Sequence, residues 1–383
     1  MTTFMGVAGR AYPTRGSIYS ADVNGMIYNV PVGGWDNIDL VDAGCVPVVA
    51  VPTANYRNLL DGGDFTINPF QRNVPGLASS NVIANAIGNT VTYFADRWFA
   101  VGGVSSAVLM ASVANTAIPG FSRALRLTRQ ASNTDTTTIS FGQVLETADC
   151  IRLQGQTVTL SFYAAADANY SGGALSVQVI TGAGSNQSAA AMVAGSWMAQ
   201  ANAINKTQTL TTAMTRYQFS GTIPTSATQV GVLLQWTPSG AAGTADGIDF
   251  IGIQFEIGSV ASPFEFRDVQ VELEICQRYA WVIPEPAAGV VVGIGGNVTG
   301  ANSQTFYLAT PVQLRTAPTV TVSAGSFQVA GGAAAAAATS MAAGTTHTPN
   351  AISITTARTE AAGVAASLQG GGGTGYIVAS ADF

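Results

Sequence analysis

Short runs in which apolar and polar residues alternate constrain this chain more than any other feature. In QTVTLSFYAAA (156–166), Val158, Leu160 and Phe162 are separated by hydroxyl residues, which is the pattern of a half-buried strand. The same style recurs in ALSVQVITG (174–182), TRYQFSGTI (215–223), QVGVLLQWTP (229–238) and GIDFIGIQFEIG (247–258). Clusters of Gly, Asn, Ser and Pro separate the runs. The sequence therefore predicts a mainly β chain with a jelly-roll-like β-sandwich.

Ionised side chains are scarce in this chain. Asp, Glu, Lys and Arg make up 9% of the 383 residues, against about 25% in an ordinary domain. Because 47% of the residues are hydrophobic, the chain can bury a core and disorder is not expected. The net charge of −6 argues against a nucleic-acid partner, which requires a basic surface. The chain has no apolar run of about 20 residues, so we do not expect it to insert into a membrane.

Changes in composition divide the chain into four parts. We expect a small N-terminal attachment unit over residues 1–55 and the sandwich over 56–267. A short linker helix over 268–283 then leads to a small C-terminal β domain over 284–383. In that last domain, AGGAAAAAATSMAAG (330–344) has high helix propensity but lies between glycines, so a helix and a packed loop are both open.

The N-terminal part has its own local signals. GSIYSADVNGMIYNVP predicts two strands joined by an Asn24-Gly25 hairpin turn, and WDNIDLVDAGC predicts a helix from Asp36 to Gly44. A unit of this length has little core of its own. We expect it to pack on a neighbouring protein or on other copies of the chain in a trimer.

FEFRDVQVELEICQRYAW (264–281) concentrates the charges that the rest of the chain lacks. Its apolar residues follow spacings of four, three and four, which fit a helix. Asp268 is a suitable N-cap, and Glu274 and Arg278 form an i, i+4 pair. We therefore expect the charges to line the exposed or inter-subunit side of a helix that joins two β domains. The residues expected on its inner side are Val269, Leu273, Cys276 and Ala280.

No motif predicts catalysis or a cofactor. The single histidine, His347, lies in a polar loop without a nucleophile nearby. Asp61 and Asp64 could form the carboxylate pair of a glycosidase, but their Gly-Gly turn favours aspartate for local backbone hydrogen bonds. GIGGNVTG (293–300) is a turn cluster without a following helix. Cys45, Cys150 and Cys276 fit neither a disulfide framework nor a zinc pattern, so we expect neither a metal nor a cofactor.

An ordered set of motifs runs through most of the chain. The motifs are NLLDGGDFTINPFQR (58–72), YFADRW (93–98), RALRLTR (123–129), QVLE (143–146), GQTVTLSFYAAA (155–166), IDFIGIQFEIGSVASPFEFR (248–267), ELEICQRY (272–279), PVQLRTAPTVT (311–321) and the final ASADF. In this order they resemble a family of tailed-bacteriophage virion proteins described as tail fibres or structural proteins. Residues 19–47 also resemble a short segment of small phage virion proteins. The resemblance implies a fibre, often trimeric, with a sandwich like that of carbohydrate-binding modules.

We therefore expect a non-enzymatic fibre subunit on the virion surface, with a tail fibre preferred and its N-terminus attached to the virion. A head fibre or decoration protein is the first alternative, and a glycan depolymerase is the second. A homotrimer is expected because a charge-poor chain would otherwise expose apolar patches. Its expected ligand is host surface polysaccharide or lipopolysaccharide.

Sugars stack on aromatic rings, so aromatic residues in loops or at strand ends are the candidate glycan contacts. They are Tyr170, Trp197, Trp236 and Tyr307. Each is individually more typical of a sandwich core. We expect the fragment 56–383, and not the fragment 1–55, to bind host cells.

Overall fold

The computed structural model divides into two compact units, Met1–Tyr56 and Arg57–Phe383. The first unit ends one residue beyond the boundary expected at 55. In that unit the structure describes only five strands and Tyr56. In the second unit it describes residues 57–65, 82–87, 89–105, 108–115, 117–294, 296–300, 303–323, 327–331, 334–337, 340–344, 347–357, 366–373 and 375–383.

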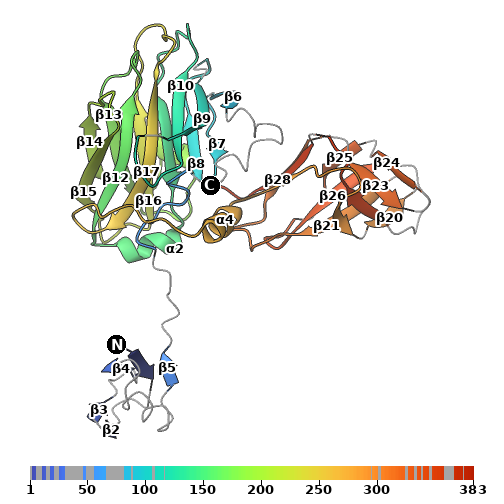
Figure 1. Cartoon of the computed structure of the whole chain (residues 1–383), viewed down its shortest axis with the longest axis horizontal. Helices are drawn as coiled ribbons and strands as arrows, with labels where there is room; N and C mark the ends of the chain where they lie inside the picture. The colour runs from blue at the N-terminus through green and yellow to red at the C-terminus, as the bar shows by residue number, and fades with distance from the viewer. Residues whose placement is uncertain are drawn as a thin grey trace. The chain divides into compact units, whose positions relative to one another are not determined.

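Two antiparallel six-stranded sheets form the sandwich (Figure 1). The first sheet has the order β15-β12-β17-β10-β9-β6, and the second has the order β14-β13-β16-β11-β8-β7. The strands of the first sheet are β6 (Val82–Ile87), β9 (Val108–Ala114), β10 (Arg123–Arg129), β12 (Thr157–Ala166), β15 (Thr215–Thr222) and β17 (Gly247–Ile257). Those of the second are β7 (Thr92–Ala95), β8 (Trp98–Val101), β11 (Ile139–Val144), β13 (Leu175–Gly182), β14 (Ala201–Gln208) and β16 (Gln229–Trp236).

The strands β10 to β17 have the connectivity of a jelly roll. We number these eight strands from one to eight in chain order. Strands one, eight, three and six then lie in the first sheet, and strands two, seven, four and five lie in the second. This alternation between sheets is the double Greek key. The predicted jelly-roll-like sandwich is confirmed, as are the five strand runs from which it was predicted.

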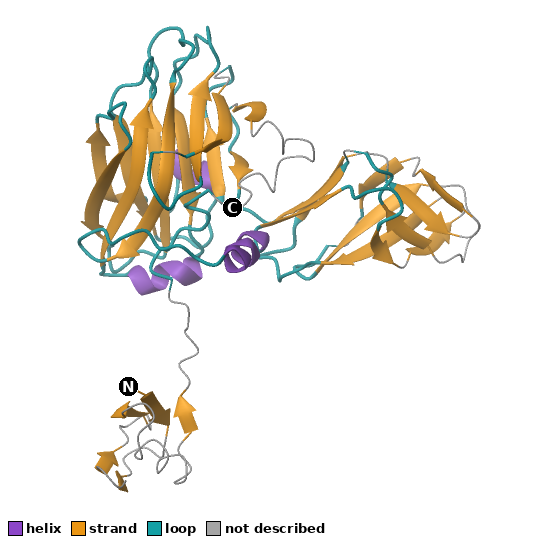
Figure 2. Cartoon of the chain, in the orientation of Figure 1, coloured by secondary structure: helices purple, strands orange, loops and turns teal. Residues whose placement is uncertain are grey.

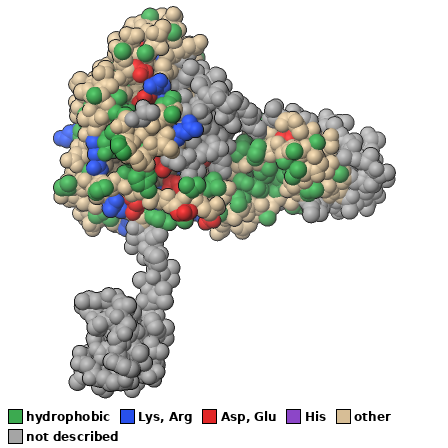
Figure 3. Space-filling view, in the orientation of Figure 1, with side chains coloured by type: hydrophobic (Ala, Val, Ile, Leu, Met, Phe, Trp, Pro, Cys, Tyr) green, Lys and Arg blue, Asp and Glu red, His purple; other side chains and the backbone are tan. Residues whose placement is uncertain are grey.

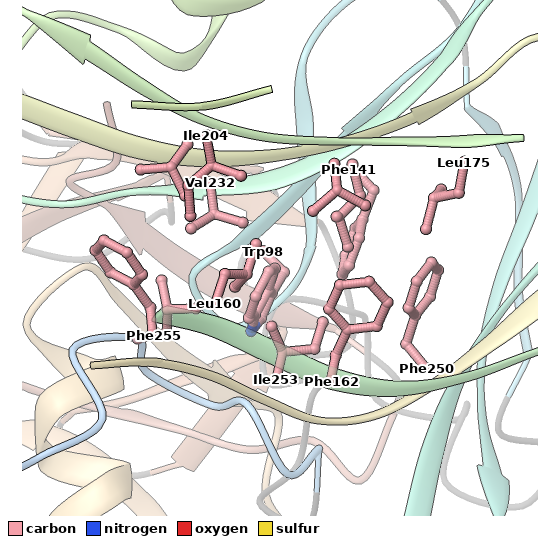
Figure 4. Close-up of a cluster of buried hydrophobic side chains, with 14 of the residues drawn as sticks. Trp98, Phe141, Leu160, Phe162, Leu175, Ile204, Val232, Phe250, Ile253 and Phe255 are labelled. Atoms are coloured by element: carbon pink, nitrogen blue, oxygen red, sulfur yellow. The ribbon is translucent and has the colours of Figure 1, made fainter. Parts of the chain in front are cut away.

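The core lies between the two sheets (Figure 4). Val158, Leu160 and Phe162 of β12 are fully buried, as their alternation predicts. Phe162 packs across from Phe141 and Trp98 of the second sheet, whose rings stack with centroids 4.9 Å apart. Buried aromatic and aliphatic side chains from both sheets together give the sandwich its hydrophobic stabilisation.

Helices are short and few in the described part of the chain (Figure 2). They are α2 (Thr147–Cys150), α3 (Ala189–Val193), α4 (Val269–Gln277) and the 3-10 turn η2 (Ile151–Leu153). Asp268 caps α4 by accepting a hydrogen bond from the Gln270 amide at 2.9 Å, as predicted. Among the described residues, none of the helices has the length and apolar character needed to cross a bilayer.

Three smaller sheets follow α4, with the orders β18-β28-β22, β19-β27-β23-β24 and β20-β21-β26-β25. Their core includes Phe306, Phe327 and Ile354. The strands are β18 (Ala280–Pro284), β19 (Val291–Ile294), β20 (Gly296–Gly300), β21 (Ser303–Ala309), β22 (Thr319–Ser323), β23 (Gln328–Gly331), β24 (Ala334–Ala337), β25 (Ser340–Ala343), β26 (Ala351–Ala357), β27 (Ala366–Gln369) and β28 (Tyr376–Ser380).

Two expectations for this region are wrong. Residues 268–283 are not one helix, because α4 ends at Gln277 and β18 pairs with β28 from Ala280↔Ser380 to Pro284↔Tyr376. The alanine-rich segment 330–344 contributes strands instead of a helix or loop, since β24 pairs with β23 and β25 pairs with β26. In both places strand pairing overrides local propensity. The partner of β18 is distant in sequence, whereas β24 and β25 pair with the strands next to them in the chain.

In the first unit, β1 (Thr2–Met5), β4 (Met26–Val30) and β5 (Val46–Val48) form one sheet, and β2 (Ala11–Pro13) pairs with β3 (Ile18–Ser20). The Asn24-Gly25 hairpin is therefore wrong, because the two runs that it was to join pair with β2 and with β1 instead of with each other. The helix expected from Asp36 to Gly44, and Cys45, lie outside the described residues.

Candidate functional site

The outer face of the second sheet is divided into an apolar half and a polar half. Phe99, Val144, Ile180 and Leu233 form the apolar half, and the loop that carries α3 covers it with Met192 and Trp197. Ser188 caps α3 by accepting from the Ala191 amide, and its carbonyl accepts from Trp197 Nε1 at 2.9 Å. This half of the face is therefore closed to a ligand.

A polar row occupies the other half of this face. We use this name for Ser140 of β11, Gln235 of β16, and Ser176 and Gln178 of β13. Gln235 lies directly opposite Ser140 on one side and Ser176 on the other. Its amide donates to Ser140 Oγ at 2.8 Å and accepts from Gln178 Nε2 at 2.9 Å. Gln178 Nε2 also lies 2.9 Å from Ser176 Oγ.

A groove of about 280 Å³ opens at the Ser176 and Gln235 end of this row. Its lining residues are Thr138, Gly173, Ala174, Ser176, Gln235, Trp236 and Thr237. The Thr138 and Thr237 hydroxyls lie 2.8 Å apart, and both residues are exposed. None of the lining side chains carries a charge. Hydroxyl and amide groups both donate and accept, so each retains capacity for a further partner.

Arg129 fixes the loops beside the groove. Its guanidinium is buried and makes a 2.8 Å ion pair with Asp246. It also donates to Ser171 Oγ and to the carbonyls of Asn133, Asp135 and Gly240. A planar fork with five donors is suited to such a junction. One side chain thereby holds three loops, which lead into the strands that carry the groove.

The four predicted aromatic contacts are distributed over separate regions. Tyr170 is half-buried and Trp236 is 3% exposed, and both lie beside Gly172; Trp236 lines the groove, whereas Tyr170 does not. Trp197 is also 3% exposed, and it belongs to the closed apolar half of the face. Tyr307 is 60% exposed on β21, in the sheets that follow α4. The structure thus brings together two of the four, and neither Trp197 nor Trp236 offers an open ring face.

The charges of 264–281 were expected on an exposed side; Asp268 and Glu274 are exposed, but Arg267 and Glu272 are not. Arg267 and Glu272 are both nearly buried and lie 3.0 Å apart. Arg267 also contacts Asp61 at 3.3 Å, and Glu272 accepts from the Gly62 amide. Arg278 pairs with Glu146 at 2.8 Å instead of with Glu274. Val269, expected on the inner side, is 60% exposed, whereas Cys276 is buried as predicted.

Asp61 serves this network and offers no hydrolytic pair with Asp64. Its carboxylate contacts Arg97 at 2.9 Å as well as Arg267. The cavity beside Asp64 and Glu272 measures about 10 Å³, which is room for roughly one water. A sugar ring does not fit there. His347 accepts a hydrogen bond from the Ser353 amide at 3.3 Å, a role within its own loop.

The two cysteines in the described part of the chain, Cys150 and Cys276, are free and buried. Burial raises the pKa of the Cys150 thiol to about 12, so this thiol stays protonated and acts as a small apolar side chain. Among the described residues, no group of three or more His, Cys, Asp or Glu side chains could hold a metal ion.

Charged side chains appear as separate small patches on the face of the described chain that Figure 3 shows. The polar row was not predicted from the sequence. A signal was present, because Ser176 and Gln178 alternate with the buried Leu175, Val177 and Val179 of β13. Which polar positions on neighbouring strands meet depends on register, which the sequence does not state.

The fold defines the chain as a jelly-roll β-sandwich protein. No family model and no curated protein matches it. A CBM4 carbohydrate-binding module is similar over 52% of this chain and 99% of its own, with 20% identity and a TM-score of 0.31. The enzymatically active domain of tailspike protein 4 of bacteriophage CBA120 matches over 53% and 22%, with 13% identity and a TM-score of 0.31. A xylan-binding CBM22 domain matches over 43% and 90%, with 15% identity and a TM-score of 0.29. At these TM-scores the likeness bears on neither ligand nor activity.

Proposed function

We propose that this protein is a subunit of a bacteriophage fibre whose sandwich binds glycan on the host surface without catalysis. The observation that carries the proposal is the groove over the polar row. Ligand sites orient their ligands by a few placed polar groups, and here the hydroxyls of Thr138, Ser176 and Thr237 and the amide of Gln235 line one open concavity.

The chemistry of the groove matches a sugar chain. A sugar presents many hydroxyl groups, each of which donates and accepts, and the side chains of Thr138, Thr237, Ser176 and Gln235 do the same. The face of the sheet beyond the groove is covered by α3 and its loop, so a bound chain would run over the uncovered half. The fibre assignment rests on the ordered motifs over residues 58–383, and attachment to the virion is assigned to residues 1–55.

An array of bacterial O-chain and capsular polysaccharides tests the binding role. The full-length protein should bind at least one member, and the best-binding member is then used for titration calorimetry. Removing both exposed hydroxyls in Thr138→Ala/Thr237→Ala should weaken binding about 10-fold, since each hydrogen bond contributes about 0.5–1.5 kcal/mol. The matched control is Thr222→Ala/Thr225→Ala, which removes two exposed hydroxyls outside the groove and should leave affinity unchanged.

Failure to bind any polysaccharide of the array would contradict the glycan role. Equal affinity of both double variants would contradict the groove as its site.

For the fibre role, an N-terminal label should appear on intact virions at the base of a projecting fibre by electron microscopy, and its position distinguishes tail from head. A label absent from the virion would overturn that assignment.

A further inference from the structure

Tyr170 has a buried hydroxyl that lacks a hydrogen-bond partner among the described residues. Buried polar groups in folded proteins are nearly always paired, and each exception calls for a physical reason. The Tyr170 ring packs against the sandwich core, so the hydroxyl cannot turn to solvent without moving its neighbours. The fold therefore places a hydroxyl without a partner among the described residues at a defined position.

That place is separated from the groove by two glycines. A Cβ atom at Gly172 would overlap the Tyr170 hydroxyl and would lie 2.8 Å from Trp236 Cδ1. Gly172 thus fits between the two aromatic residues because it has no side chain. The next residue, Gly173, lines the groove together with Trp236. The Tyr170 hydroxyl consequently lies directly behind the groove wall.

The wall is anchored at Ser171 and again where β13 begins, because Leu175 pairs with Gln208 and Ser176 pairs with Gln235. The Ser171 amide donates to Asp246 at 2.8 Å, its hydroxyl donates to Asp246 at 2.7 Å, and its carbonyl accepts from Ser239. Beyond it, Gly172 forms an isolated bridge with Pro238. The space where a Gly173 Cβ would lie has no atom within 4 Å. Two consecutive glycines have the backbone freedom to move, while Ser171 keeps Tyr170 in place.

The protonation state of Tyr170 favours donation. Burial, with a smaller effect of Asp246, raises the pKa of its hydroxyl far above the ordinary value. The group therefore remains a neutral O–H, which donates a proton and accepts through its oxygen. A neutral sugar hydroxyl or ring oxygen is a suitable partner for such a group.

We propose that the Tyr170 hydroxyl is a ligand-binding group of the groove, and that Gly172 and Gly173 move aside so that it donates to a sugar oxygen. This inference rests on the proposed glycan-binding function. It makes Tyr170 a specificity-determining residue, because a ligand lacking an oxygen at that point would leave the hydroxyl unpaired. The alternative is a buried water that pairs with the hydroxyl in the free protein.

The variant Tyr170→Phe separates these alternatives in the full-length protein through two readouts. If the hydroxyl is unpaired in the free protein, its removal should raise the thermal midpoint by about 2–4 °C. The same variant should bind the selected array polysaccharide roughly 3- to 10-fold more weakly. Tyr217→Phe is the matched control, because Tyr217 is half-buried on β15 and does not line the groove. It should leave affinity unchanged.

A lower thermal midpoint for Tyr170→Phe would show that the hydroxyl has a partner in the free protein and would overturn the inference. Unchanged affinity would overturn it as well, while binding of the unsubstituted protein to the array would leave the glycan role standing. If no array polysaccharide binds, the proposed function itself fails. The two failures are therefore distinguishable.

Discussion

The guanidinium of Arg97 lies 3.4 Å from the centre of the Tyr279 ring. Arg97 is buried in the sandwich beside β8, and Tyr279 follows α4 directly. A cation over an aromatic face is attracted by the ring quadrupole, most strongly where water is excluded. Tyr279 Oη also donates to Glu146 at 2.6 Å. This contact joins α4 to the sandwich.

We expect Arg97→Ala to be strongly destabilising. The substitution removes one of the two arginine partners of Asp61 and the cation over Tyr279, and breaking a buried ion pair costs about 3–5 kcal/mol. Chemical denaturation monitored by tryptophan fluorescence measures the loss. Arg152→Ala is the control, because Arg152 is about half exposed and 3.8 Å from Asp149, so it should change stability by less than about 1 kcal/mol. Similar losses for both variants would show that the Arg97 contacts contribute little.

Glu146 should give the chain a specific dependence of stability on pH. Burial alone would raise the pKa of Glu146, but hydrogen bonds from Arg278 and Tyr279 outweigh it and hold the pKa below the ordinary value of 4.5. A carboxyl with a lowered folded-state pKa stabilises the fold above its unfolded pKa, and this contribution disappears as pH falls through the folded pKa. The difference in unfolding free energy between the unsubstituted protein and Glu146→Gln should therefore be about 1–3 kcal/mol at pH 7.

Below pH 4.5 that difference should shrink steadily. Urea titrations at several pH values measure it, with Glu274→Gln as the control on an exposed position of α4. A difference that stays constant from neutral to acidic pH would mean that the Glu146 carboxylate is not the group responsible.

Substitution by alanine should destabilise the protein by different amounts at two glycines that have left-handed backbone conformations. Gly252 of β17 has φ +58°, and a Cβ there would lie 2.6 Å from Phe121 Cζ. Gly195 has φ +71° and open space around the Cβ position. Gly195→Ala should cost only the backbone strain of about 1–2 kcal/mol, whereas Gly252→Ala adds the displacement of a packed ring. Thermal denaturation compares them, and an equal cost would contradict the packing of Phe121 against Gly252.

The homotrimer remains a prediction. A chain this poor in charge needs another means of covering apolar surface, and closed cyclic assembly provides one. Light scattering at micromolar concentration should give three times the 39.1 kDa chain mass. A stable mass of 39.1 kDa would show a monomer and remove the trimer from the account.

Local sequence patterns were enough to predict the strands. The buried charges and the polar row were not predicted, because they depend on contacts between residues that are distant in sequence. The alternation in 156–166 was enough to predict β12 as a strand, but not its burial, because Thr159 and Ser161 on the other face are buried as well. The charges around Arg267 were misplaced, since the groups that bury them, Asp61 and Gly62, lie about 200 positions earlier in the chain. The polar row depends on the register of β11, β16 and β13, which no single strand encodes.

The most direct test of the central claim is a structure of the full-length protein with an oligosaccharide of the polysaccharide selected from the array. We predict density for a sugar over the polar row, between the Thr138–Thr237 pair and Ser176, with Gln235 beneath it. We also predict that Gly172 and Gly173 shift, so that the Tyr170 hydroxyl lies within hydrogen-bond distance of a sugar oxygen. Sugar density elsewhere, as at the exposed Tyr307 ring, with an empty groove would contradict the account.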